Sequence, residues 1–277
     1  MFGSTGSGKT HCLEGSNSDP GLASLIGDNL FNLMEDKRFR TSTGQGNFQF
    51  QIKMRYVEIV DEEVRDLLQG SYGVSRNTLQ VVLNEWEGAS VNGVQWVPMA
   101  NQHQLADFIA NGSRNRTQKQ NEFGRMSEKA TAVFSLEITQ ITESGSDTNV
   151  LVSRLNIVDL PSCEILNEDP EALRVKQGST LNRGIQALNT LIRELSANQH
   201  GDNAYYEGST VTQLLRDSFG GNSLTMGIFT VQYGDPIGST LTLRAMKRCQ
   251  AIMNFPVIND NRTIGLLRKY RIELAAH

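Results

Sequence analysis

The sequence predicts a single α/β domain in which helices cover both faces of a central sheet. Strand-like apolar runs alternate along the chain with segments whose apolar residues recur at helical spacing. Residues 1–10 form a glycine-rich loop, and the first helical pattern follows it. No internal repeat, low-complexity tract or clear linker divides the 277 residues, which favours one domain over two.

The strands are predicted from alternation and from continuous apolar runs. Phe48–Val60 alternates apolar and polar residues at its start, which is typical of a half-buried strand. Val150–Leu160 is apolar almost throughout until Asp159, which suits a strand in the middle of a sheet. The other predicted strands are Thr131–Thr142 and Leu224–Tyr233.

The helices are predicted from periodicity and from their caps. Asn101 caps a helix, with Gln104 placed for a capping box, and Asp61 has the position of an N-cap for a short helix through Leu68. Apolar spacing predicts the remaining helices at Leu22–Met34, Glu171–Ala197, Ser209–Phe219 and Ser239–Met253.

The composition limits which binding partners and which cellular compartment are expected. A hydrophobic fraction of 38% is enough for a buried core, and no apolar run approaches the ~20 residues that span a bilayer. The net charge of −4 counts mildly against binding of nucleic acid or of an anionic filament by electrostatics alone. Neither nucleic acid nor a membrane is expected as a partner. Cys12, Cys163 and Cys249 lie far apart and the histidines show no ligand spacing, so we expect free thiols in an intracellular protein.

Residues 3–10 match the phosphate-loop pattern Gly-x-x-x-x-Gly-Lys-Thr in full. In such a loop the glycines let backbone amides face the phosphates, Lys9 meets the β- and γ-phosphates, and the Thr10 hydroxyl ligates Mg²⁺. Only Met1 and Phe2 precede the loop, so its feeding strand must come from elsewhere or be absent. The expected nucleotide-binding residues are Gly3, Ser4, Thr5, Gly6, Ser7, Gly8, Lys9, Thr10 and His11.

Further blocks follow the phosphate loop in the order in which kinesin motor domains carry them. They are Asp19–Leu22, Tyr56–Leu68, Val158–Leu160 with Glu164, Leu181–Leu188, Leu215–Ser223, Pro256–Asp260 and Leu266–Tyr270. Together with residues 3–10 they span nearly the whole chain, which therefore resembles the motor domain of a kinesin.

The resemblance implies a kinesin-like P-loop NTPase, with a twisted mixed sheet between helices, ATP or ADP with Mg²⁺ at one edge and a microtubule on the opposite face. Residues 1–253 would be a partial motor domain without the strands and the adenine-holding Arg-Pro segment that precede the loop in the family. Residues 254–277 would be the neck linker and the start of a neck helix, similar to those of ciliary transport kinesins. Leu267, Tyr270 and Leu274 could begin a coiled coil with a dimer partner or an ordinary terminal helix. The implied location is the cytoplasm and cytoskeleton, with the cilium or axoneme suggested by the neck.

The segment that resembles switch II departs from the family. Active kinesins carry Asp-Leu-Ala-Gly-Ser-Glu, whereas this chain carries Asp159 to Glu164 with Pro161 and Ser162 between them. Asp159 can still hold a Mg²⁺-bound water, and Asp159, Glu164 and Lys9 are the expected catalytic residues. Proline and serine restrict backbone conformations that glycine enters freely, so we expect a stiffer hinge.

The segment that resembles switch I departs further. With Ala132–Phe134 as the anchor, Glu128 stands where the family has a serine that contacts Mg²⁺ and phosphate. Lys129 could pair with Glu164 as the family's arginine does, but without a bidentate fork. A second alignment, through Asn121 and Glu122, requires an insertion and does not restore the serine pair.

The expected filament-binding face has lost basic residues. Glu207, Thr210 and Gln213 stand where kinesins carry basic side chains, which should weaken binding to acidic tubulin. The basic residues expected to keep some affinity are Arg174, Lys176, Arg183 and Arg216.

Three functional hypotheses follow. The first is a kinesin-like protein that binds nucleotide, hydrolyses little or no ATP, and has a structural or regulatory role on microtubules. The second is a slow but active microtubule-stimulated motor. The third is a P-loop NTPase from outside the kinesin family, and the blocks beyond the phosphate loop speak against it.

Overall fold

The computed structural model describes residues 1–16, 18–44, 46–68, 79–84, 88–101, 103–116, 130–162, 183–197, 204–261 and 263–264. Most of the segment that resembles switch I, the end of switch II from residue 163 on, and the proposed neck helix lie outside these ranges.

The central sheet is built around three long antiparallel strands, and two short strands pair with the first of them. Gly145, at φ 62°, lies in the tight turn that joins β7 to β8. The predicted strands 48–60, 131–142 and 150–160 are confirmed within a few residues at their ends, but among the described strands the last one lies at the edge of this sheet and not in its middle. The strands of this sheet are β2 (Asn47–Val60), β3 (Glu63–Asp66), β6 (Val97–Met99), β7 (Thr131–Ser144) and β8 (Asp147–Asp159).

A short strand feeds the phosphate loop. β1 (Phe2–Gly3) pairs in parallel with β9 (Phe229–Thr230), and the Leu160 amide donates to the Met1 carbonyl at 3.3 Å. β1 therefore lies between the end of β8 and β9. The expectation that the feeding strand comes from elsewhere or is absent is wrong for these residues, because two residues suffice to form the parallel contacts.

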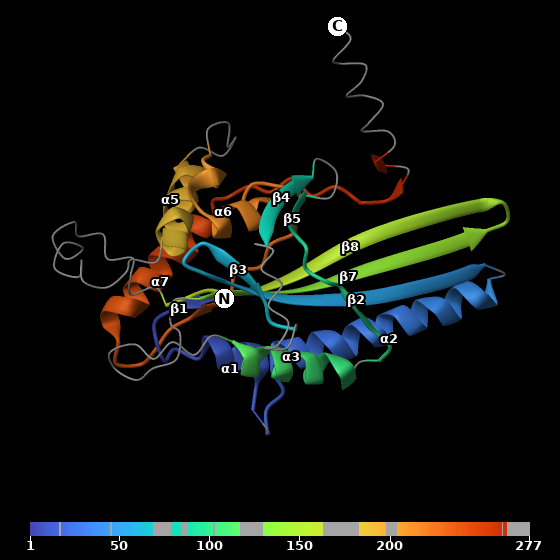
Figure 1. The fold of residues 1–277 in the computed structure, drawn as a ribbon, viewed down its shortest axis with the longest axis horizontal. Helices are drawn as coiled ribbons and strands as arrows, with labels where there is room; N and C mark the ends of the chain where they lie inside the picture. The colour runs from blue at the N-terminus through green and yellow to red at the C-terminus, as the bar shows by residue number, and fades with distance from the viewer. Residues whose placement is uncertain are drawn as a thin grey trace, which may run out of the picture.

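Helices cover both faces of the central sheet (Figure 1). Leu13, Phe31 and Leu105 pack in one hydrophobic cluster, whereas Ile185 and Ala245 belong to the cluster on the opposite face. The first group of helices is α1 (Lys9–Glu14), α2 (Leu22–Thr43) and α3 (His103–Asn115). The second group is α5 (Arg183–Ala197), α6 (Thr210–Leu214) and α7 (Pro236–Cys249).

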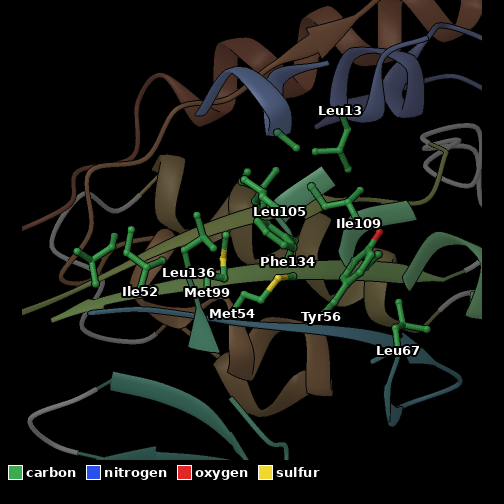
Figure 2. Packing of buried hydrophobic residues seen from close by; sticks show 14 of the residues in the cluster. Leu13, Ile52, Met54, Tyr56, Leu67, Met99, Leu105, Ile109, Phe134 and Leu136 are labelled. Carbon is green, nitrogen blue, oxygen red and sulfur yellow. The ribbon is translucent and has the colours of Figure 1, made fainter. Parts of the chain in front are cut away.

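The two clusters follow from the alternation of side chains along each strand. Tyr56 and Phe134 lie in the cluster under α1–α3, with ring centroids 5.8 Å apart (Figure 2). Their neighbours Val57 and Val133 point to the other cluster. Both faces of β2 and β7 are therefore buried at these positions, so apolar residues stand next to one another there instead of alternating with polar ones.

The short helix predicted for residues 61–68 is wrong. Asp61 and Glu62 both have positive φ, at 51° and 69°, and form the turn between β2 and β3. Such left-handed pairs suit two-residue hairpins, and the strand that returns pairs with β2. Asp61 is therefore a turn residue and not an N-cap.

The other helices were predicted with varying accuracy at their ends. The cap of α3 is confirmed, because the Gln104 amide donates to Asn101 Oδ1 at 3.1 Å and the Ala100 amide donates to Gln104 Oε1 at 2.8 Å. α2 continues nine residues beyond Met34, to Thr43, and α7 begins at Pro236, where the Asp235 carboxylate caps it by accepting from Gly238. The segment after Ser209 holds α6 and then the 3₁₀ turn η3 (Arg216–Ser218).

One hairpin was not predicted, and one predicted strand is much shorter than expected. β4 (Gln80–Asn84) and β5 (Gly88–Asn92) form a separate hairpin, which is anchored where the Ala89 amide donates to Asp217 Oδ2 at 2.9 Å. The predicted strand 224–233 is reduced to the two residues of β9.

Within the described ranges, no helix combines the length and the apolar character needed to cross a membrane.

The segment proposed as a neck linker runs beside β8. The Val152 amide donates to the Asn259 carbonyl at 3.2 Å, and the Val257 amide donates to Asn222 Oδ1 at 2.6 Å. Residues 254–261 thus contact the central sheet and the loop after η3. Leu267, Tyr270 and Leu274 lie outside the described residues.

Candidate functional site

The glycine-rich loop joins β1 to the first turn of α1. Gly8 is the N-cap of α1 at φ 95°, and Gly6 has φ 76°. Both conformations are left-handed and are adopted readily by glycine. The loop therefore brings consecutive backbone amides to the positive end of a helix, which is the arrangement that suits bound anions.

Side chains fix the loop onto β9. The Ser7 hydroxyl contacts the Ser4 carbonyl and Thr230 Oγ1, each at 2.7 Å. A Cβ atom at Gly3 would lie 2.3 Å from Thr230 Oγ1 and 2.6 Å from Ser7 Oγ, so only glycine fits there. These contacts hold the loop backbone against β9.

Lys9 lies across its own loop. The Nζ ammonium donates to the carbonyls of Gly3 and Ser4 at 2.9 and 2.8 Å. Thr10 and His11 follow on the exposed first turn of α1, and His11 Nε2 lies 3.7 Å from Asp19 Oδ2. The residues predicted from Gly3 to His11 are thus brought together on one loop and one helical turn.

Asp159 ends β8 and is buried beside this loop. Its Oδ2 accepts from Arg116 Nη1 at 2.9 Å, whereas its Oδ1 is buried and receives no hydrogen bond from the described residues. An orphaned carboxylate oxygen next to a phosphate loop fits the role of holding a metal-bound water. Thr10 and Asp159 are the residues that would hold Mg²⁺.

Arg116 was missed by the sequence reasoning. It follows the last residue of α3, and its only sequence signal is a basic side chain at a helix C-terminus. Burial opposes its charge, but Asp159 and other nearby groups outweigh burial and raise the pKa of the guanidinium. The arginine therefore stays charged and neutralises one oxygen of Asp159.

The end of β8 contacts the loop directly. Thr5 Oγ1 donates to Ser162 Oγ at 2.9 Å, and Ser162 is buried. Ser162 was expected to stiffen a hinge through its backbone. The structure adds a side-chain contact that the sequence pattern did not predict. Glu164 and Lys129 lie outside the described residues.

The expected filament face is only partly described. Arg183 Nε donates to the Gly208 carbonyl at 3.2 Å, and Arg216 stacks over the Tyr206 ring at 4.9 Å. Arg216 Nη1 also lies 3.9 Å from Glu207 Oε1. Both arginines therefore meet at η2 (Tyr206–Gly208), and Glu207 offsets part of their charge. Arg174 and Lys176 lie outside the described residues.

Comparison with known proteins identifies the family. The family model for the kinesin motor domain matches residues 1–251. This chain belongs to the kinesin family. The P-loop NTPase from outside the family, our third hypothesis, is therefore excluded.

Relatives and solved structures agree with this assignment. The kinesin-like protein KIF16B of Homo sapiens is 31% identical over 287 aligned positions, which cover 99% of this chain and 21% of that protein. The kinesin-like protein KIN-4C of Arabidopsis thaliana is 28% identical, with 99% of this chain and 23% of the relative covered. This chain thus spans about a fifth of the length of these relatives.

The fold matches solved kinesin motors. A KIF14 dimer with AMP-PNP, in complex with a microtubule, superposes with a TM-score of 0.78 and 25% identity, covering 97% of this chain and 75% of that one. A fast kinesin superposes with a TM-score of 0.75 and 21% identity, which supports the fold alone. The expected α/β motor fold is confirmed.

Proposed function

We propose that this kinesin motor domain binds ADP or ATP with Mg²⁺ at residues 3–11 and hydrolyses ATP slowly or not at all. The observation that carries the proposal is the loop between β1 and α1, where Gly6 and Gly8 take left-handed conformations ahead of a helix N-terminus. The related KIF14 structure contains the ATP analogue AMP-PNP. Nucleotide binding is therefore the activity that the loop supports best.

Different residues of the chain would bind the phosphates, the metal ion and its water at this site. Lys9 would exchange its bonds to two loop carbonyls for bonds to phosphate oxygens, and Thr10 would place its hydroxyl on Mg²⁺. Asp159 would orient a metal-bound water through Oδ1, to which no described residue donates a hydrogen bond, while Arg116 keeps its Oδ2 occupied. Mg²⁺ would supply charge neutralisation between the phosphates.

Slow turnover is proposed from the sequence of the two segments that would face the terminal phosphate. Glu128 places a negative charge where the family has a serine, and Pro161 with Ser162 replaces the flexible Ala-Gly pair. Positioning and charge neutralisation supply most of the catalysis in phosphoryl transfer, so both changes should slow it. A slow but active motor is the second candidate.

We also propose that the chain associates with microtubules through the face that carries Arg183 and Arg216. The KIF14 relative is bound to a microtubule in its structure, which supports this partner. The affinity should be reduced, because Glu207 lies beside Arg216. A cytoskeletal location follows from this proposal. A ciliary role and dimerisation through a neck helix rest on the resemblance of residues 254–277 alone.

Equilibrium binding of a fluorescent ADP analogue, together with steady-state phosphate release with and without microtubules, tests the proposal. We expect Mg²⁺-dependent nucleotide binding that is lost in Lys9→Ala, and phosphate release that microtubules accelerate little. Strong microtubule-stimulated release that Lys9→Ala abolishes would instead establish the slow-motor alternative. No nucleotide binding by the wild type would refute both candidates.

A further inference from the structure

The phosphate loop and the end of β8 are joined by a pair of hydroxyl groups. Thr5 Oγ1 donates to Ser162 Oγ at 2.9 Å, which is a normal hydroxyl–hydroxyl distance. Ser162 is buried, and Thr5 is partly buried. Because little water reaches this bond, breaking it without a replacement partner leaves a buried polar group unsatisfied.

Both sides of the contact are fixed. On the loop side, Ser7 is bonded to the Ser4 carbonyl and to Thr230, so the loop cannot shift freely. On the strand side, the Leu160 amide is bonded to the Met1 carbonyl, and Pro161 has a locked φ and restricts the residue before it. The segment therefore has little freedom to move away from the loop without breaking the hydrogen bond between Ser162 and Thr5.

In P-loop NTPases, the segments that face the nucleotide are ordered by contacts to the terminal phosphate. In this chain, two protein hydroxyls also join the loop to the segment. A diphosphate lacks the terminal group that these segments sense, so it can bind without disturbing the contact. We expect a triphosphate to draw the segment toward its terminal phosphate, which would break this bond.

We propose that Ser162 and Thr5 form a latch that makes this site select ADP over ATP. Ser162 is then a specificity-determining residue, and its effect comes from the side chain as well as from the backbone stiffness of Pro161. The inference rests on the proposed nucleotide binding and adds which nucleotide the site prefers.

The test is the ratio of the dissociation constants of AMP-PNP and ADP, measured at saturating Mg²⁺ on the full chain. Ser162→Ala removes the hydroxyl and leaves Pro161 in place, and Thr5→Val removes the partner at nearly the same volume. Each variant should lower the AMP-PNP-to-ADP ratio about 3- to 10-fold, the value of one net hydrogen bond. Ser196→Ala on α5, where an exposed hydroxyl donates to the Arg193 carbonyl, is the matched control and should leave the ratio unchanged.

The double variant shows whether the two residues act through one bond. If they do, Thr5→Val with Ser162→Ala changes the ratio no more than either single variant. The latch is overturned if both single variants leave the ratio unchanged, or if their effects add in the double variant. The proposed function still holds in that case, provided that ADP binds. Failure of both nucleotides to bind the wild type overturns the proposed function and the latch with it.

Discussion

At the scale of single residues, the site depends on which groups pair with one buried carboxylate, that of Asp159. Asp159 has one oxygen paired with Arg116 and the other unpaired among the described residues. A buried carboxylate with no counter-charge is costly, so the arginine permits the aspartate to stay in a nearly dry position. Arg116 is thus a positioning residue for Asp159.

We predict that Arg116→Met lowers the free energy of unfolding by about 3 kcal/mol, because it strips the buried carboxylate of its partner. Arg114→Met, two residues earlier, changes an exposed arginine whose Nε bonds the Ala110 carbonyl and should cost less than about 1 kcal/mol. Urea unfolding followed by circular dichroism measures both. Equal losses in the two variants would contradict the role given to Arg116.

Two glycines, Gly112 of α3 and Gly8 of the loop, are required for different reasons. A Cβ at Gly112 of α3 would lie 2.1 Å from Cδ1 of the buried Tyr56 ring, whereas a Cβ at Gly8 would meet nothing within 4 Å. Gly112 is therefore required by packing and Gly8 by its left-handed backbone. The sequence alone does not tell these two requirements apart, because close packing and backbone conformation are seen only in the structure.

At the scale of elements, η2 brings opposite charges to the proposed filament face. Glu207 of η2 lies near Arg216, and Arg183 of α5 bonds the Gly208 carbonyl. An exposed pair such as Glu207–Arg216 adds little stability, so its main effect is on the local field.

We predict that Glu207→Arg raises the affinity for microtubules several-fold at low salt, with the gain shrinking as ionic strength rises. Glu35→Arg on α2 makes the same charge change on the opposite face, next to Arg38 instead of Arg216. Co-sedimentation over a salt series compares the two. An equal gain in Glu35→Arg would mean that net charge, and not this face, controls binding.

The turn after β2 explains why one element was mispredicted. Asp61 before a helical spacing of apolar residues predicts an N-cap, but pairing of Glu63–Asp66 with β2 is stronger than that local preference. Glu62 then accepts hydrogen bonds from the Thr210 amide and hydroxyl at the start of α6. The hairpin thus supports the filament face, which no local pattern reveals.

At the scale of the whole molecule, one edge of the fold presents exposed apolar residues. β9 pairs with β1 on one side, and no described strand pairs with its other side. Leu224 and Met226 precede β9, Val231 follows it and Tyr233 lies in the next turn, and they are 90%, 85%, 52% and 105% exposed, respectively. An exposed apolar edge of this kind favours association between chains.

We predict that residues 1–277 self-associate at micromolar concentration, and that Met226→Lys with Val231→Lys shifts them toward monomers. Leu33→Lys on α2 removes another exposed apolar side chain, away from this edge, and should have little effect. Size-exclusion chromatography with light scattering gives the mass. A wild-type chain that stays monomeric at every concentration would show that this edge does not mediate self-association.

The sequence by itself determined the glycine-rich loop, the long strands, most helices and the kinesin family. These signals are local or ordered along the chain: glycine spacing, side-chain alternation, apolar periodicity, and blocks that recur in a fixed order. They do not depend on which distant residues meet.

Only the tertiary structure decided the pairing of Arg116 with Asp159, the contact of Thr5 with Ser162, and the hairpin at Asp61. Each joins groups whose preference in isolation is weak or different, and each is fixed by burial between elements far apart in the chain. Burial makes an unpaired charge or hydroxyl costly, so partners in the fold overrule local tendencies.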